Sequence, residues 1–140
     1  MQLFGLALTL LYLVKFRFLK EAKQLSTNLL NKIIKTNKRH LDSLQAFCLF
    51  YYSRVNELSG HLRQIRPQLF DYYRRACIKT DEIGQATVIN LILRNFIEFQ
   101  QFSQAEKFMN QSSFPETISN NENVRYLYYT ALIKTTSLEY

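Results

Sequence analysis

Residues 13–25 read LVKFRFLKEAKQL and residues 96–108 read FIEFQQFSQAEKF, and the apolar positions of the two stretches coincide at an offset of 83 residues. In each stretch, a helix with large apolar side chains leads through a short polar turn into a second helix. A small residue, Ala22 or Ala105, stands at the same place in each second helix. The sequence therefore predicts a repeated helical hairpin in which a bulky side chain packs over an alanine.

The offset of 83 corresponds to two units of about 41 residues, and the stretch 41–79 fills the gap between them. The unit is longer than the tetratricopeptide repeat of about 34 residues and lacks its tryptophan, so the match is to the tetratricopeptide-like class. We expect an all-α fold of antiparallel helical hairpins stacked as a tetratricopeptide-like right-handed solenoid. The expected hairpins are 1–36, 41–79 and 83–112, followed by a final unpaired helix at 120–140.

Composition supports a helical fold. The chain has 140 residues, of which 47% are hydrophobic, with only 3 Gly and 2 Pro. So few turn residues argue against a many-stranded sandwich or barrel and against a Gly-rich phosphate loop. With 9 Tyr and 11 Phe, the chain is also unlike a disordered one, because disordered sequences are poor in aromatic residues.

Several residues mark the expected helix ends. Gly60 follows Ser59 as a helix stop, and Pro67 suits the first turn of the next helix. The hydroxyl of Thr80, with two acids after it, is expected to cap the helix that follows. Ser103–Glu106 and Ser119–Glu122 both have the Ser-x-x-Glu spacing of a capping box.

Apolar stripes indicate which sides of the helices are buried. The run Leu3–Val14 has about 12 residues where a spanning helix needs about 20, and no basic segment precedes it, so it predicts a core helix and no membrane partner. Nothing in the chain is expected to cover this run or the stripe of the last helix, which indicates a segment of a longer solenoid. Two stripes illustrate the period: Leu41, Leu44, Cys48, Tyr51, Val55 and Leu58, and then Val124, Leu127, Tyr128, Ala131 and Leu138.

No arrangement of residues indicates catalysis. His40 and His61 are 21 residues apart, and neither has a second metal-ligating His or Cys nearby, so both are predicted at the surface or at helix ends. Cys48 and Cys77 lie in apolar stripes and are predicted to be buried thiols of an intracellular protein. We therefore predict that the chain is not an enzyme, with no catalytic, cofactor-binding or metal-binding residues, no cofactor and no small-molecule substrate.

The net charge of +7 leaves nucleic-acid binding as an alternative. Basic residues gather at Lys35, Lys38, Arg39 and His40, and again in the stretch Tyr72–Arg75, where Tyr73 is expected to point inward with Ala76. A repeat that reads bases places equivalent polar residues in each unit, and we find none. A solvated face or a protein contact is favoured over RNA binding.

Six runs of residues resemble a known family in order and spacing. They resemble the family of non-ATPase regulatory subunit 3 of the 26S proteasome, whose members are lid subunits with a PCI domain. The resemblance covers essentially the whole chain. The runs are YYSRV at 51–55, GQAT at 84–87, NLILRN at 90–95, QAEK at 104–107, SFPE at 113–116 and NVRYLYY at 123–129.

The resemblance implies that residues 1–140 form the helical-repeat segment preceding a PCI domain that is not present. It implies a non-catalytic scaffold of the regulatory particle lid, in the cytoplasm and nucleus, with other lid subunits as partners. Such a scaffold supports ATP-dependent degradation of ubiquitinated proteins through protein–protein contacts. The alternatives are an RNA-binding helical repeat, or a scaffold of a sister PCI complex, the signalosome or a translation initiation complex.

Overall fold

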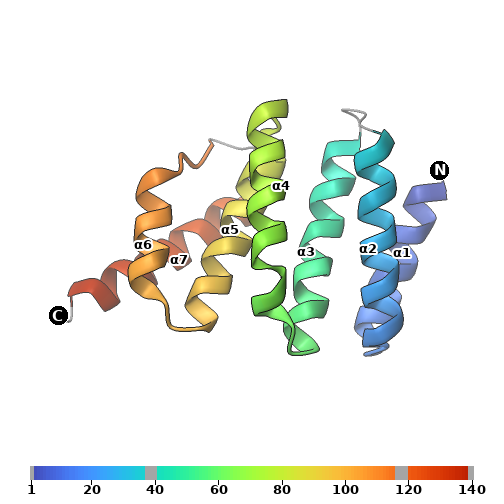
Figure 1. The fold of residues 1–140 in the computed structure, drawn as a ribbon, viewed down its shortest axis with the longest axis horizontal. Helices are drawn as coiled ribbons and strands as arrows, with labels where there is room; N and C mark the ends of the chain where they lie inside the picture. The colour runs from blue at the N-terminus through green and yellow to red at the C-terminus, as the bar shows by residue number, and fades with distance from the viewer. Residues whose placement is uncertain (1, 37–40, 116–119, 139–140) are drawn as a thin grey trace. The chain divides into compact units, whose positions relative to one another are not determined.

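Every regular element in the computed structural model, which describes residues 2–36, 41–115 and 120–138, is helical (Figure 1). The predicted all-α fold class is therefore confirmed. The elements are α1 (Gln2–Lys15), α2 (Leu19–Thr36), α3 (Asp42–Leu58), the short 3-10 helix η2 (Leu62–Ile65), α4 (Arg66–Lys79), α5 (Glu82–Glu98), α6 (Phe102–Gln111) and α7 (Asn120–Leu138).

The first compact unit comprises residues 1–65, in which α1, α2 and α3 all contact one another (Figure 1). Leu10 of α1, Ala22 of α2 and Val55 of α3 are fully buried together at its centre. Around them pack partly buried hydrophobic side chains, each of which contributes less than the about 1.5–3 kcal/mol gained when a large apolar side chain is fully buried. These neighbours are Leu13, Val14, Leu25 and Tyr51.

The second compact unit comprises residues 66–140 and is built around α5, which α4, α6 and α7 all contact. Eleven residues of α5 are buried, so this helix is covered on nearly every side. Aromatic rings join α4 to its neighbours: Phe70 lies edge-on to Phe96 of α5 at 6.2 Å and to Phe108 of α6 at 5.5 Å between centroids. The residues that form this core come from helices that follow one another along the chain.

The predicted repeat is visible in the backbone of two turns. Arg17, after α1, has a φ of 64°, and Gln100, which is 83 residues later and follows α5, has a φ of 56°. Each is the left-handed residue of a Schellman motif, in which two backbone N–H groups donate back to carbonyls of the last helical turn. The donor and acceptor pairs are Arg17 to Val14, Phe18 to Leu13, Gln100 to Ile97 and Gln101 to Phe96.

The two alanines of the repeat also occupy equivalent places. Ala22 and Ala105 both have no exposed surface, and each donates its backbone N–H to the residue four positions earlier, at 2.9 and 3.0 Å. A larger side chain at either position would separate the paired helices. The predicted burial of both alanines is confirmed.

The same motif ends α3 and α4. Gly60 has a φ of 82° after α3, which confirms the predicted stop, and Thr80 has a φ of 55° after α4. The prediction that the Thr80 hydroxyl caps α5 is wrong, because Thr80 closes the preceding helix. Asp81 is the cap instead: its carboxylate accepts from the Gly84 N–H at 3.0 Å. A Cβ at Gly84 would collide with this carboxylate, so the glycine makes room for the cap.

The predicted capping box at Ser103–Glu106 is also wrong. The helix α6 begins at Phe102, with Gln101 at the N-cap position and no hydrogen bond from its side chain to the helix. Because the Schellman turn at Gln100 redirects the backbone at once, Ser103 falls inside the first helical turn, where its hydroxyl is past the capping position. Ser119 of the second predicted box lies outside the described residues.

The boundary between the two units falls between η2 and α4, inside the stretch 41–79. Pro67 is the second residue of α4, in the first turn as predicted. The pairing of α3 with α4 and the stacking of the hairpins as a solenoid stay predictions.

Candidate functional site

The most apolar exposed surface of the first unit lies on α1. Large hydrophobic side chains recur there every three or four residues, on the side of the helix opposite the buried Ala7 and Leu10. The rings of Tyr12 and Phe16 pack against each other at 4.6 Å between centroids. We call this surface the outer face of α1, and it consists of Phe4, Leu8, Leu11 and Tyr12, together with Phe16, which directly follows the helix.

One end of this face is basic. Lys15 and Arg17 flank Phe16 in sequence and are exposed, and the Lys15 ammonium lies 6.0 Å from the Phe16 ring centroid; Lys20, at the start of α2, is exposed as well. The first acidic residue of the chain is Glu21. The outer face of α1 therefore combines an apolar stripe with positive charge at its C-terminal end.

A second exposed apolar surface lies on α7. Val124, Leu127 and Tyr128 are exposed, whereas Tyr129 and Ile133 are buried. Since α7 contacts α5 and α6, its buried side is the one that carries Tyr129 and Ile133. Val124, Leu127 and Tyr128 of the predicted stripe are therefore on the outward side of α7, while the opposite side of the helix packs against α5 and α6.

A buried polar network anchors the start of α7 to α5. The Asn90 amide donates to the Glu122 backbone carbonyl at 2.9 Å and to its carboxylate at 2.7 Å, and Arg125 donates to the other carboxylate oxygen at 2.6 Å. Hydrogen bonds to a charged acceptor are among the strongest in proteins. Sequence reasoning missed this network because Asn90 lies within the apolar run at 86–93 and its partner is 32 residues away.

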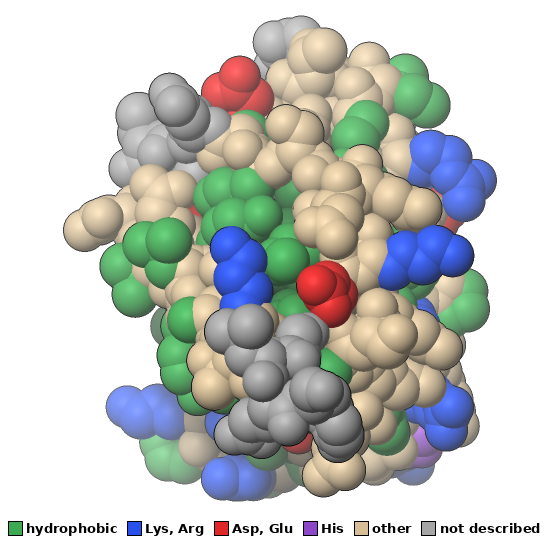
Figure 2. Space-filling view, turned by 90° about the vertical axis from the view of Figure 1, so that its left-hand side faces the viewer, with side chains coloured by type: hydrophobic (Ala, Val, Ile, Leu, Met, Phe, Trp, Pro, Cys, Tyr) green, Lys and Arg blue, Asp and Glu red, His purple; other side chains and the backbone are tan. Residues whose placement is uncertain are grey.

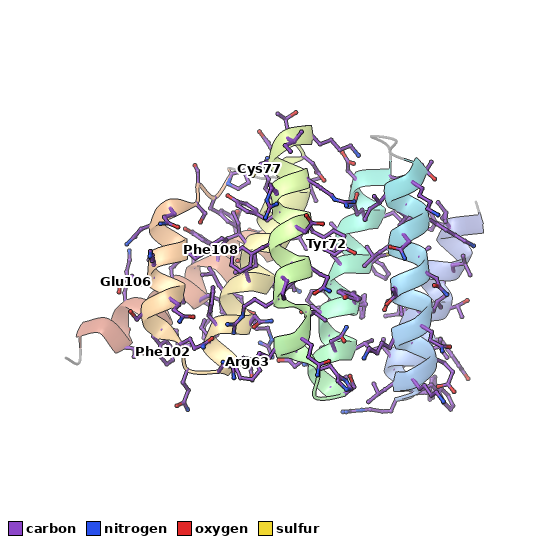
Figure 3. The ribbon with its side chains drawn as sticks, in the orientation of Figure 1. Arg63, Tyr72, Cys77, Phe102, Glu106 and Phe108 are labelled. Atoms are coloured by element: carbon purple, nitrogen blue, oxygen red, sulfur yellow. The ribbon has the colours of Figure 1, made fainter. Side chains whose placement is uncertain are left out.

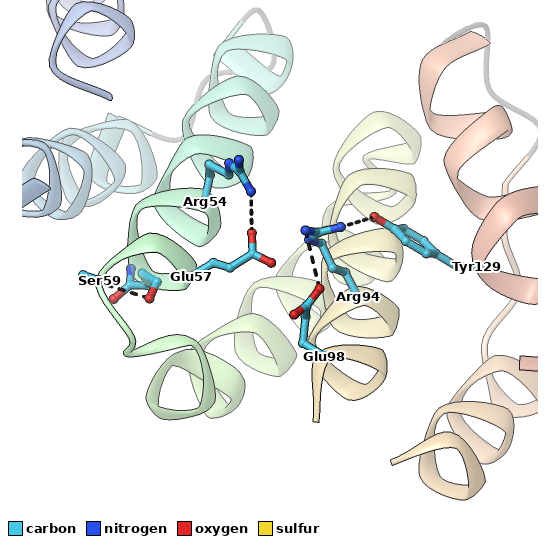
Figure 4. A network of polar contacts seen from close by, with 7 residues as sticks. Arg54, Glu57, Ser59, Arg94, Glu98 and Tyr129 are labelled. Carbon is cyan, nitrogen blue, oxygen red and sulfur yellow. Dashed lines mark hydrogen bonds and ion pairs between the residues drawn. The ribbon is translucent and has the colours of Figure 1, made fainter. Parts of the chain in front are cut away.

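Ion pairs on the surface contribute less to stability than this buried network. Arg94 lies 3.6 Å from Glu98 and 3.5 Å from the Tyr129 hydroxyl, which adds a polar contact between α5 and α7 (Figure 4). In the first unit, Arg54 donates to Glu57 at 2.9 Å along α3. Exposed pairs of this kind contribute at most about 1 kcal/mol.

The aromatic and basic stretch Tyr72–Arg75 is arranged as predicted. The ring of Tyr73 lies edge-on to Phe108 at 5.7 Å, while Arg74 and Arg75 are exposed. Arg75 also lies 3.5 Å from the Asp71 carboxylate. On the side of the second unit shown in Figure 2, basic side chains are separated by hydrophobic and neutral ones. The cations are dispersed over this side.

The two cysteines have different surroundings. Cys48 is buried, and burial raises its pKa from 9.0 to about 12. Cys77 is exposed, so the prediction that it is buried is wrong. Ala76 is buried on α4, and Cys77, labelled in Figure 3, is the next residue, about 100° further round the helix. Burial and a hydrogen bond with Cys77 raise the pKa of Tyr73 to about 12.

His61 lies just after α3, as predicted, with its Nδ1 3.1 Å from the Ser59 hydroxyl. His40 lies outside the described residues, with Lys38 and Arg39. Within residues 2–36, 41–115 and 120–138, no three His, Cys, Asp or Glu side chains are grouped so that they could hold a metal ion. No helix in those same ranges has both the length and the hydropathy required to cross a bilayer.

Comparisons with a family model and with known proteins point to the same family. A family model described as "PSMD3-like, N-terminal TPR repeats" matches residues 2–140. The chain is 46% identical over 122 residues to the probable 26S proteasome non-ATPase regulatory subunit 3 of Anopheles stephensi, which covers 87% of this chain and 24% of that protein.

Two further relatives match over a longer part of the chain. The probable subunit 3 of Drosophila melanogaster is 41% identical over 133 residues, and the subunit 3 of Dictyostelium discoideum is 35% identical over 133 residues. Each match covers 95% of this chain, with 27% and 26% of the relative. The chain thus spans about a quarter of the length of the curated relatives it matches.

Proposed function

Because the chain belongs to the family of PSMD3-like N-terminal TPR repeats, we propose that it is a structural scaffold segment of the proteasome regulatory particle and acts through protein contacts. The observation that carries this proposal is the family match, which extends over residues 2–140. The relatives named above are 26S proteasome non-ATPase regulatory subunits.

The exposed surfaces support a binding role. The outer face of α1 and the outward side of α7 present contiguous large hydrophobic side chains, which on soluble proteins mark interaction sites. The groups with the largest pKa shifts, Cys48 and Tyr73, are protonated at neutral pH and so supply neither a thiolate nor a phenolate for catalysis. We propose that function is carried by these surfaces and that the segment is non-catalytic.

In the cell, the proposed segment precedes a PCI domain in the whole subunit and contacts other subunits of the lid. It supports ATP-dependent degradation of ubiquitinated proteins in the cytoplasm and nucleus. We also propose that α3 and α4 pair as the hairpin 41–79, so that the hairpins stack as a right-handed solenoid. Small-angle X-ray scattering by the purified chain tests this architecture, because one stacked solenoid gives a single rigid particle and two jointed units give a broader distance distribution.

The functional test is purification of the tagged chain from cells of its own organism, followed by mass spectrometry of the proteins that accompany it. We expect other proteasome regulatory subunits in stoichiometric amounts. Leu127→Glu, on the outward side of α7, should reduce their recovery, whereas Ile78→Glu, at a side chain that is 81% exposed on α4, should not.

Two other outcomes would replace the proposal. Recovery of signalosome or translation initiation subunits in place of proteasome subunits would assign the chain to a sister PCI complex. Submicromolar nucleic-acid binding that weakens steeply as salt rises would favour an RNA-binding repeat.

A further inference from the structure

We propose that the solvent-facing side of α2 is a docking surface for an acidic segment of another protein, whose carboxylates pair with the lysines of this helix. The inference rests on the proposed scaffold role and deepens it by naming the chemistry of one partner. We call this surface the basic side of α2. It consists of Lys20, Lys23, Lys32 and Lys35, together with the neutral polar side chains of Gln24, Thr27, Asn28 and Asn31.

The positive charge of the chain is concentrated around this helix. Residues 15–39 contain eight basic residues and one acidic residue, Glu21, so this stretch alone accounts for the net charge of +7. In the rest of the chain, ten basic residues balance ten acidic ones. A local excess of one sign favours association with a partner of the opposite sign.

The arrangement of α2 keeps these charges at the surface. Lys20 and Lys35 stand at the two ends of the exposed stripe, about 22 Å apart along the helix axis, and are both exposed. Lysine is almost never fully buried unless it is paired, so this side faces solvent because of its own composition. The buried residues of the helix, on the opposite side, are Ala22, Ser26, Leu29, Leu30 and Ile33.

The lysines of the basic side of α2 are not committed to partners within the chain. In the part of the chain that the structure describes, their ammonium groups form neither an ion pair nor a hydrogen bond. Arginines on other helices differ, because each has a carboxylate nearby: Arg54, Arg94 and Arg125 lie 2.9, 3.6 and 2.6 Å from glutamates. Carboxylates for the lysines must therefore come from a partner.

The neutral side chains favour a polypeptide over a nucleic acid. Gln24, Asn28 and Asn31 each present an amide oxygen as well as N–H donors. The backbone N–H groups of a polypeptide can donate to these oxygens, whereas a phosphodiester backbone offers acceptors only. The helix α2 also has no aromatic residue and no arginine, which are the usual stacking platforms for bases.

A shallow hollow lies on this side of the helix. Its volume is about 490 Å³, and it is lined by Lys23, Gln24, Thr27 and Asn28. A carboxylate in the hollow can accept from the Lys23 ammonium and from the amide groups of its neighbours. Hydrogen bonds between ionised partners are stronger than neutral ones, so the hollow is the place where we expect an acidic side chain to bind.

A second copy of this chain is a poorer occupant. Two basic sides of α2 brought together would repel each other, because Glu21 is the one acidic residue in the stretch 15–39. Acidic residues elsewhere in the chain are partly engaged: Glu57, Glu98 and Glu122 are paired with arginines. An acidic segment of a different protein carries neither disadvantage.

The test measures binding of the purified chain to two synthetic 12-residue peptides. One peptide is rich in glutamate, and the other has glutamine in place of every glutamate. We expect the glutamate peptide to bind at least about tenfold more tightly at low salt, with the difference shrinking as ionic strength rises. Equal binding of the two peptides would overturn the proposal.

Two variants with the same net charge locate the binding surface. The first replaces the four lysines of the basic side of α2 with glutamine, which has a similar helix propensity, and should weaken binding of the glutamate peptide at least about tenfold. The second replaces four exposed cations of the second unit and should weaken binding less than about threefold. Its substitutions are Arg74→Gln, Arg75→Gln, Lys107→Gln and Lys134→Gln.

Circular dichroism of both variants checks that the helices are intact. Equal losses of binding in the two variants would show that the peptide responds to net charge alone, and would overturn the assignment to α2. Binding that survives replacement of the four lysines would overturn it as well.

Two further outcomes would assign the surface to another class of partner. A 12-nucleotide uridine RNA that binds as tightly as the glutamate peptide, and loses binding in the first variant, would indicate a nucleic-acid surface. Binding to vesicles containing about 30% phosphatidylserine, without binding to either peptide, would indicate a membrane surface. Either result would overturn the proposal.

Failure of this proposal is distinguishable from failure of the scaffold role. Equal binding of the two peptides would remove the docking surface and leave the co-purification of proteasome subunits unaffected. Absence of proteasome subunits from the co-purified material would contradict the scaffold role and leave the peptide result standing.

Discussion

Arg17 and Gln100 occupy equivalent turns of the two repeat copies and share a left-handed backbone, with φ values of 64° and 56°. A left-handed conformation costs an L-residue about 1–2 kcal/mol, and glycine adopts it without that cost. The turns keep this geometry because two backbone hydrogen bonds close each of them. Each turn therefore contains strain that a substitution can relieve.

We predict that Gln100→Gly stabilises the chain. Relief of the strain exceeds the added backbone entropy of the unfolded state, which is about 0.4–1 kcal/mol, and leaves a net gain of about 0.5–1 kcal/mol. Urea unfolding of the variant should show a higher midpoint with an unchanged slope. The control Gln24→Gly, at an exposed position inside α2, should lose about 1 kcal/mol. A lower midpoint for Gln100→Gly would contradict the assigned turn.

The Asp81 cap and Gly84 are coupled. Gly84→Ala places a methyl group against the Asp81 carboxylate and should destabilise the chain by about 1–2 kcal/mol, although alanine is the better helix former. In a chain that already carries Asp81→Ala, the same substitution should stabilise by up to about 1 kcal/mol, because the collision is gone. A double-mutant cycle in urea measures both effects, and additive energies would refute the coupling.

Ala105→Arg should unfold the second hairpin copy. Ala105 has no exposed surface, and burial of an unpaired guanidinium costs several kcal/mol. Thermal unfolding followed by circular dichroism should show a large decrease in the midpoint. The neighbouring substitution Gln104→Arg, at an exposed position, should leave the midpoint nearly unchanged. Equal midpoints for the two variants would show that the hairpin assignment is wrong.

Asn90→Asp tests the anchor of α7. The substitution brings a second carboxylate next to that of Glu122, where the amide now donates at 2.7 Å. Like charges this close raise the pKa of one carboxyl, so the variant should be destabilised by more than about 2 kcal/mol at pH 7 and recover as pH falls below about 5. Asn90→Ala should show no such recovery. Faster amide hydrogen exchange in the first turn of α7 would report the local loss of stability.

The two thiols should differ in reactivity. At pH 8, a disulfide reagent should modify Cys77 in the folded chain and Cys48 only after unfolding. Cys77→Ser isolates the buried thiol, and rapid modification of this variant while folded would contradict the burial of Cys48.

The pKa of Cys48 also links stability to pH. The folded chain retains the proton up to about pH 12, whereas the unfolded thiol has a pKa of 9.0. Stability is therefore unaffected by this group below about pH 9, and falls as pH rises from 9 towards 12.

The helical repeat was predictable because Ala22 and Ala105 sit in matching apolar patterns that depend only on local sequence. The turn residues were harder to predict. Thr80 is of a residue type preferred at N-caps, but it closes the preceding helix. It can do so because the backbone hydrogen bonds of a Schellman motif do not depend on the side chain. The helix stop at Gly60 was predicted correctly, because glycine is the usual residue at the left-handed position of such a turn.

The apolar period placed some helix faces correctly and missed polar partners. Tyr73 and Ala76 were predicted on the inner side of α4 and contact the core, but Cys77 was assigned to the same side and lies in solvent. The bond from Asn90 to Glu122 could not be predicted, because it depends on how α7 lies across α5. The run Leu3–Val14 was predicted as a core helix, and the structure buries one side of it, with Ala7 and Leu10, while the outer face of α1 is exposed.

The four Schellman turns have a consequence for how this family can diverge. Their hydrogen bonds join backbone atoms only, and the left-handed position is occupied by arginine, glycine, threonine and glutamine in turn. Substitutions at these positions therefore change stability by small amounts while the direction of the following helix is preserved. The turn residues can therefore change in evolution while the path of the backbone is kept. Structural similarity between family members will then persist after their sequences have diverged.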